Sequence, residues 1–289
     1  MVGVPTVAPY RRDDRTFKGR RSKFHVKHRN PKSDTKSGKQ IIFVTNNSTK
    51  SRAEHCLHFQ KMGIPVLEEE IFTSAYSSAL YVSRILKLHA PRNKVFVLGE
   101  ESIGAELASE GVDYIGGSDP TYQRDVTAAD FEEIASGKGL DPTVGAVVVG
   151  MDMKVNYLKL CYAAQYIARG AVFLATNTDS TYPALGTLFP GAGCISGALV
   201  PMIGREPLSL GKPSPAMISA IQSRYSLDLK RCCMVGDRLD TDIRLGVDGG
   251  LGGTLLVLSG VSKKEDLETG DPKYMPDAYI DQLSDLLPS

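Results

Sequence analysis

The stretch IIFVTNNS, residues 41–48, marks a sharp change in the character of this chain. Four apolar, β-favouring residues are followed at once by four polar ones. This order predicts a buried strand over 41–44 that ends in a polar turn. A helix is expected next, over 51–61, because Gly63 and Pro65 stop it.

The same alternation of strand and helix continues towards the C-terminus. Strands separated by helices of ten or more residues indicate an α/β protein with largely parallel sheets. A Pro/Gly-rich stretch over 183–203 has no predicted element. The other expected strands are 94–98, 146–149, 171–175, 232–235 and, as the last clear one, 254–258; the other expected helices are 75–88, 103–110, 157–168 and 215–225.

Composition excludes several classes of protein. With 289 residues, 42% of them hydrophobic, the chain has enough apolar material for one large or two small domains. It has no apolar run of about 18 residues, so we expect no membrane partner, and no signal peptide is recognisable. Five cysteines are too few for a disulfide scaffold and lack zinc-site spacing. We therefore expect a cytoplasmic, reducing location.

Charge is distributed unevenly along the chain. Residues 1–40 carry 12 Lys and Arg against 3 Asp and Glu, whereas the rest carries 22 against 30. We interpret residues 1–39 as a basic, disordered head. A basic head can bind nucleic acid, but this one has no recognisable nucleic-acid-binding motif, and we expect a solvated tail instead.

Three polar loops follow strands or precede helices, where ligands bind in open α/β sheets. Thr45-Asn46-Asn47-Ser48 offers hydroxyl, amide and backbone N–H groups to an anion. On this segment alone, a helix cap and turn is the simpler interpretation. Lys212, in the loop 211–215, could meet a phosphate oxygen, or could be a solvated lysine at a helix start.

The third loop, GDRLDTD over 236–242, has three carboxylates in six residues. Such carboxylates repel one another unless a cation relieves them, and oxygen ligands suit Mg²⁺. Acidic residues at a helix N-terminus would explain Asp240 or Asp242 as well. They explain less well why Asp237 directly follows Gly236 at a strand end. Together the three loops have the parts used for phosphoryl transfer, which depends on charge neutralisation.

These loops resemble motifs II, III and IV of the haloacid dehalogenase superfamily, at residues 44–49, 211–213 and 236–242. Residues 38–289 resemble more narrowly its 4-nitrophenylphosphatase/phosphoglycolate phosphatase branch, with support from 174–179, 189–193 and 251–254. The resemblance implies a Rossmann-like core with a parallel sheet and an inserted α/β cap of the C2 type. The core would comprise 40–87 and 207–289, and the cap 88–206.

The resemblance also implies roles for single residues. Thr45 would bind the transferring phosphoryl group, with Asn46 and Asn47 assisting. Lys212 would neutralise the phosphate, Asp237 would bind Mg²⁺, and Asp242 would hold a metal-bound water or orient Lys212. Asp240 would be a surface or supporting acid. The cap would select a small-molecule phosphate monoester, with 190–196 as the selective loop, and would be the contact surface of any homodimer.

Motif I of the family, an apolar strand followed by Asp-x-Asp-Gly, is missing. Its first aspartate is the family's nucleophile and its second the general acid. The acids before Thr45 are Asp13, Asp14 and Asp34, and none follows a strand pattern. We therefore take the first core strand to be missing and the head to be a misread or rearranged N-terminus. The leading hypothesis is a Mg²⁺-dependent phosphatase, and the rival is an inactive family member that still binds phosphate esters.

Overall fold

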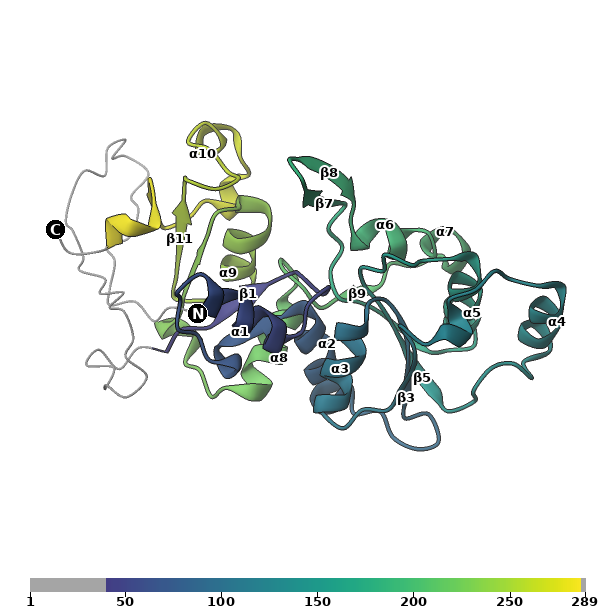
Figure 1. The fold of residues 1–289 in the computed structure, drawn as a ribbon. Coiled ribbons are helices and arrows are strands. Elements are labelled where there is room, and N and C mark those ends of the chain that lie inside the picture. Colours follow the sequence, from purple (N-terminus) through teal and green to yellow (C-terminus); the bar gives the residue numbers. More distant parts are fainter. Residues whose placement is uncertain (1–39, 287–289) are drawn as a thin grey trace.

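The computed structural model describes residues 40–286, and the head predicted to be disordered lies outside them. Figure 1 shows an elongated molecule with two sheet-containing parts joined in the middle by α2, α3 and β9. Within the described residues, no helix combines the length and the apolar character needed to cross a bilayer.

The larger part is built on one five-stranded parallel sheet with the order β4-β3-β5-β6-β9. Its central strands are continuous apolar runs, as expected for strands with both faces covered; all six residues of β5 are buried. The strands are β3 (Lys94–Leu98), β4 (Tyr114–Gly116), β5 (Val144–Val149), β6 (Val172–Ala175) and β9 (Leu208–Ser209). The helices are α3 (Glu101–Ser109), α4 (Ala128–Ser136), α5 (Tyr157–Ala168), α6 (Ala192–Gly197) and α7 (Val200–Ile203).

The smaller part has two separate parallel sheets, β1-β2 and β10-β11-β12. The strands are β1 (Phe43–Thr45), β2 (Ile71–Thr73), β10 (Cys233–Gly236), β11 (Gly253–Val257) and β12 (Ala278–Ile280). The α-helices are α1 (Arg52–Lys61), α2 (Ser74–Leu80), α8 (Pro215–Arg224), α9 (Arg244–Asp248) and α10 (Asp266–Thr269); Tyr81–Leu86 and Leu239–Ile243 are π-helical turns. Single 3₁₀ turns lie at Glu68–Glu70, Pro120–Tyr122, Leu229–Arg231, Pro272–Tyr274 and Leu283–Leu286.

Helix α2 connects the two parts because it is buried on both sides. At helical spacing, Tyr76 and Leu80 pack into the core of the smaller part, while Ala75 and Ala79 pack against the larger sheet. The family resemblance divides the chain into an expected core (40–87 and 207–289) and an expected cap (88–206). At the boundary between them, α2 of the expected core packs directly against the sheet of the expected cap through apolar side chains.

The α/β class, the parallel sheets and nearly all strand–helix pairs predicted from the sequence are confirmed. The prediction for 183–203 was wrong. This stretch contains an antiparallel hairpin, β7 (Thr181–Ala184) with β8 (Thr187–Pro190), followed by α6 and α7. Its strands are short and mostly exposed, so they lack the apolar run that marks a buried strand. The strand predicted last, 254–258, is followed by another, β12.

Strand β1 is also less buried than the sequence predicted. All three of its residues are only partly buried, because β1 pairs with β2 alone. Among residues 40–286, no strand joins β1 to β10. The missing first core strand stays a prediction.

Candidate functional site

The loop after β1 is a tight polar turn. The Asn47 backbone N–H donates to Thr45 Oγ1 (3.1 Å), and the Thr49 N–H and hydroxyl both donate to Asn47 Oδ1 (2.8 Å each). Helix α1 then starts with a capping box in which the side chains of Ser51 and Glu54 bond to each other's backbone N–H. Residues 45–49 therefore form a turn, as the cap-and-turn interpretation of 45–48 expected, but the helix cap is Ser51, outside that segment. Thr45 also lines a groove.

Lys212, from the loop before α8, contacts the end of β1 and the acidic loop. Its ammonium donates to Asp242 Oδ1 (2.7 Å) and to the Val44 carbonyl (3.3 Å), and its side chain is 14% exposed. The preceding residue must be small: a Cβ on Gly211 would lie 2.6 Å from the Thr176 carbonyl oxygen. This close approach holds the lysine loop against the strand ends.

The three carboxylates of the acidic loop, residues 236–242, lie in three different environments. Asp242 is buried; it pairs with Lys212 and also accepts from the backbone N–H groups of Asp237 and Arg238 (3.2 Å each). Its side chain folds directly against Gly236, where a Cβ would come within 2.3 Å of it. Asp240 is exposed and pairs with Arg238, so it lies away from Lys212.

Asp237 is the carboxylate that retains a free side. Its Oδ2 accepts from the Val261 N–H (2.9 Å), and within residues 40–286 no cation pairs with it. The loop after β11 packs closely around it, since a Cβ on Gly260 would lie 2.1 Å from Oδ2.

One groove of about 380 Å³ brings these groups together. Its lining includes residues 41–45, which contain β1, and residues 234–237, which contain most of β10. Lys212 and Asp242 line it as well and are paired with each other. The three loops singled out in the sequence, more than 160 residues apart at their extremes, thus meet at the carboxyl ends of β1 and β10. An ammonium, a hydroxyl and an uncompensated carboxylate in one place suit a phosphate group accompanied by a divalent cation.

The residues present fit a magnesium ion that keeps most of its water ligands. The described residues contain no cluster of three or more His, Cys, Asp or Glu that could hold a metal. Mg²⁺, however, often takes only one or two protein carboxylates together with substrate phosphate. Asp237, with one carboxylate oxygen uncommitted, is the residue that would hold it.

Asn46 has a different environment from the one its predicted role implies. Its Oδ1 accepts from the Lys212 N–H (2.7 Å), and its Nδ2 donates to the Lys212 carbonyl (2.9 Å) and to the Asp179 carboxylate (3.1 and 3.2 Å). Here the side chain binds the lysine loop. Assistance in phosphate binding by Asn46 and Asn47 remains a prediction.

Asp179, for which no role was predicted, lies beside these groups; in the sequence it counted only as part of the run 174–179 that supports the family resemblance. It follows β6 in the run Thr176-Asn177-Thr178-Asp179, so its place after a strand end was the available signal. Neighbours in this run also contact the turn after β1. Asn177 donates to the Asn46 carbonyl (2.8 Å), and Thr176 bonds Ser48 (3.2 Å). Burial raises the pKa of the Asp179 carboxyl, and Asn46, Arg238 and Lys212 oppose that shift.

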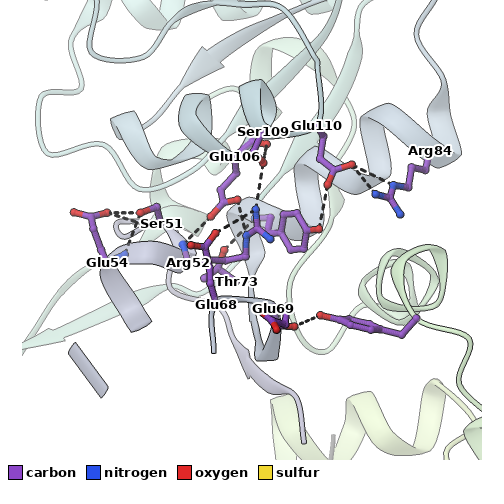
Figure 2. Close-up of polar contacts among 12 residues, drawn as sticks. Ser51, Arg52, Glu54, Glu68, Glu69, Thr73, Arg84, Glu106, Ser109 and Glu110 are labelled. Carbon is purple, nitrogen blue, oxygen red and sulfur yellow. Dashed lines mark hydrogen bonds and ion pairs between the residues drawn. The ribbon is translucent and has the colours of Figure 1, made fainter. Parts of the chain in front are cut away.

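A second polar cluster, also not found from the sequence, fixes the far end of the turn (Figure 2). Arg52, the first residue of α1, bonds Glu106 of α3 through both its backbone N–H (2.7 Å) and its Nε (2.8 Å). Its guanidinium lies 3.4 Å from the centre of the Tyr76 ring. Burial raises the pKa of Glu106, and its bonds with Arg52 oppose this.

Neighbouring groups extend this cluster across the junction. Glu110, the residue directly after α3, accepts from the Tyr76 hydroxyl (3.1 Å). It also pairs with Arg84 (2.9 Å), as Figure 2 shows. The Ser102 hydroxyl, also on α3, donates to the Ser48 carbonyl. The turn that carries Thr45 is thus held both by α3 and by the segment after β6.

Two family models match the chain. The model "Haloacid dehalogenase-like hydrolase" matches residues 32–113, and a second, HAD-hydrolase-like model matches 209–286. The 4-nitrophenylphosphatase of Schizosaccharomyces pombe is 50% identical over 250 residues, covering 86% of this chain and 82% of its own. Phosphoglycolate phosphatase 1A of Arabidopsis thaliana is 43% identical, covering 86% of this chain and 68% of its own.

Solved structures show the same relationship. A p-nitrophenyl phosphatase from Archaeoglobus fulgidus superposes with a TM-score of 0.69 at 33% identity, covering 85% of this chain and 84% of its own. A glycerol phosphate phosphatase from Mycobacterium tuberculosis in complex with magnesium has a TM-score of 0.69 at 31% identity, covering 86% and 67%. This chain belongs to the haloacid dehalogenase-like hydrolases, an enzyme family, in the 4-nitrophenylphosphatase branch.

Proposed function

We propose that the groove between β1 and β10 binds a small-molecule phosphate monoester together with Mg²⁺, and that the chain is a phosphatase for esters such as 4-nitrophenyl phosphate or 2-phosphoglycolate. The observation that carries the proposal is the meeting of Thr45, Lys212 and Asp237 at one groove. The names of the relatives support the reaction class, since those compared above are phosphatases.

Each side chain has a task that its contacts support. The Lys212 ammonium faces the groove and neutralises phosphate charge, while Asp242 holds it in place through the 2.7 Å ion pair. The Thr45 hydroxyl donates to a phosphate oxygen. Asp237 holds the magnesium ion, which neutralises the remaining charge of the ester.

Hydrolysis also needs a nucleophile, and this requirement favours a second candidate function. Among the described residues, the carboxylates that line the groove are Asp237 and Asp242. Asp242 is committed to Lys212, and Asp237 is the proposed metal ligand. A chain without a further carboxylate here would bind phosphate esters without turning them over.

The groove itself supports the prediction of a missing core strand. Its lining includes the consecutive residues 41–45, which contain β1 of one parallel sheet, and 234–237, which contain most of β10 of another. The Val44 carbonyl accepts from the Lys212 ammonium (3.3 Å), which also lines the groove. His55 also lines the groove, and its buried Nε2 has no hydrogen-bond partner within 40–286. A strand between β1 and β10 would cover these groups.

Turnover of 4-nitrophenyl phosphate with and without Mg²⁺ tests the proposal. The unaltered chain is compared with a second chain that carries an apolar strand ending in Asp-x-Asp ahead of β1, and with the Lys212→Met variant of each. Turnover that requires Mg²⁺ and Lys212 supports hydrolysis. Mg²⁺-dependent phosphate binding without turnover by the unaltered chain supports the second candidate. Failure of both chains to bind phosphate overturns the proposal.

The remaining properties follow the same family pattern. We propose that the part over 88–206 acts as the cap and that residues 190–196 help to select the ester. Figure 1 shows the neighbouring hairpin β7–β8 standing out between the β11 end of the molecule and the β3–β5 sheet. The tip of this hairpin is apolar and fully exposed at Leu185. A cytoplasmic location and a homodimer formed through the cap are also proposed.

A further inference from the structure

The oxygen and both N–H groups of the Asn46 side-chain amide form hydrogen bonds, and the partners are Lys212 and Asp179. Its oxygen accepts from the Lys212 N–H, one Nδ2 proton goes to the Lys212 carbonyl, and the other is shared between the two oxygens of Asp179. The first two bonds engage both the N–H and the carbonyl of Lys212. Lys212 is thereby fixed at its own backbone, 166 residues from Asn46 in sequence.

Asp179 reinforces the orientation of this amide that the Lys212 peptide also favours. An ionised carboxylate accepts hydrogen bonds and cannot donate them. The NH₂ group of Asn46 must therefore face Asp179, and its oxygen must face the Lys212 N–H. If the amide turned over, oxygen would face carboxylate, and the N–H of Lys212 would lose its acceptor.

Burial of the Asp179 carboxylate at this position is energetically unfavourable. It is half-buried and, within residues 40–286, forms no ion pair; its polar side-chain partner in this region is Asn46. Burying a carboxylate without a paired cation is unfavourable unless other contacts compensate. Burial does raise the pKa of this carboxyl. The two bonds from Asn46 are the side-chain contacts that offset this cost.

The backbone of Asp179 is fixed to the base of the hairpin. Its carbonyl accepts from the Gly193 N–H, and the Ser180 carbonyl accepts from the Gly191 N–H (2.9 Å each). Both glycines are needed, since a Cβ at Gly191 would lie 2.3 Å from the Asp179 carbonyl oxygen. The position of Asp179 therefore follows that of residues 190–193, next to β7–β8.

We propose that Asp179 is a positioning residue: by reinforcing the orientation of the Asn46 amide it helps to hold the Lys212 backbone in its phosphate-binding place, and it links this lysine to the hairpin segment. The part of the inference that concerns phosphate rests on the proposed function. The structural part, from Asp179 through Asn46 to Lys212, stands without it.

Hydrogen exchange at the Lys212 backbone amide, followed by NMR on the full chain, tests the link directly. Asp179→Ala is compared with Asp240→Ala, a matched control that removes the same charge from a nearby exposed site bonded to Arg238. Asn46→Ala and the double variant Asn46→Ala/Asp179→Ala complete a cycle. Thermal unfolding of each variant shows whether it folds.

The expected result is an approximately tenfold faster exchange at Lys212 in Asp179→Ala, the size of one lost hydrogen bond, and no change in Asp240→Ala. The double variant should exchange no faster than Asn46→Ala alone, because Asp179 acts through Asn46. Unchanged exchange in a folded Asp179→Ala, or effects that simply add, would overturn the inference.

A titration of the same proteins with inorganic phosphate and Mg²⁺ separates this inference from the proposed function. If the unaltered chain binds phosphate, Asp179→Ala should bind it about tenfold more weakly while Asp240→Ala is unaffected, and equal affinity would count against the inference. If the unaltered chain binds none, the proposed function fails, and the exchange rates alone decide the structural link.

Discussion

Strands β5 and β1 are both apolar parallel strands, yet β5 is buried along its whole length and β1 is only half-buried. The difference lies in their neighbours. β5 pairs with β3 on one edge and β6 on the other, whereas β1 pairs with β2 alone and faces the groove. An apolar run therefore predicts a strand, but its burial depends on partners that the run does not encode.

The difference in burial between the two sheets should have its largest effect on the stability lost when a phenylalanine is truncated to alanine. Phe96 of β3 is fully buried in the larger part, while Phe43 of β1 is partly exposed beside Phe59. We expect Phe96→Ala to lower the free energy of unfolding by about 3–5 kcal/mol, and Phe43→Ala by less than half as much. Urea denaturation of both variants measures this. Equal losses would mean that β1 is as well packed as the larger sheet.

Ion pairs give a second comparison between the same two parts. Lys159 and Asp152 are 1% and 2% exposed in the larger part, whereas Lys212 of the Lys212–Asp242 pair is 14% exposed at the groove. Lys159→Met leaves a buried carboxylate and should destabilise the chain by about 3 kcal/mol. Lys212→Met should cost clearly less, because Lys212 is more exposed and Asp242 keeps two backbone N–H donors, whereas Asp152 keeps one, from Lys154. The reverse order in thermal or urea unfolding would contradict this account of the site.

A smaller effect is expected from a methyl group at the boundary of the two parts. In Gly211→Ala the Cβ would lie 2.6 Å from the Thr176 carbonyl and 2.7 Å from Asn46 Oδ1, so the lysine loop must move. We expect a destabilisation of about 1–3 kcal/mol and weaker phosphate binding. Gly197→Ala is the control, since its Cβ would meet nothing within 4 Å. Similar stability for the two variants would show that the loop is not held as described.

The smallest effect concerns pH and the larger sheet. Hydrogen bonds from Lys94 and then Thr143 lower the pKa of Asp141 to about 2. Because this folded-state pKa lies below the unfolded value, the ionised carboxylate stabilises the fold above about pH 4, and this contribution disappears as pH falls towards 2. The stability difference between the unaltered chain and Asp141→Asn should shrink over that range in urea titrations. A constant difference would assign the effect to packing.

Secondary structure was predicted best for segments whose local sequence alone is enough to specify a strand or a helix. The boundaries of β3 and α5 were predicted to the residue from KVFVL and from the periodicity of 157–168. The three loops were found because each directly follows a strand or precedes a helix. Their meeting at one groove could be anticipated only through the family resemblance, since no local pattern encodes contacts across more than 160 residues.

The roles of Asp179 and Arg52 were not predicted, because they depend on residues that only the fold brings close. Each lies in a short polar run, and only the fold brings Asp179 to Asn46 and Arg52 to Glu106. The hairpin β7–β8 was missed for a related reason: its strands are exposed and contain two prolines, so neither alternation nor an apolar run marks them.

Calorimetric titration of the full chain with inorganic phosphate, in the presence and absence of Mg²⁺, tests most directly whether Thr45, Lys212 and Asp237 form one binding site. We predict binding that requires Mg²⁺ and that falls at least about tenfold in Lys212→Met and in Asp237→Asn, because we propose that the first residue contacts the phosphate and the second its metal. Undetectable binding by the unaltered chain, or affinity unchanged in both variants, would contradict this account of the groove.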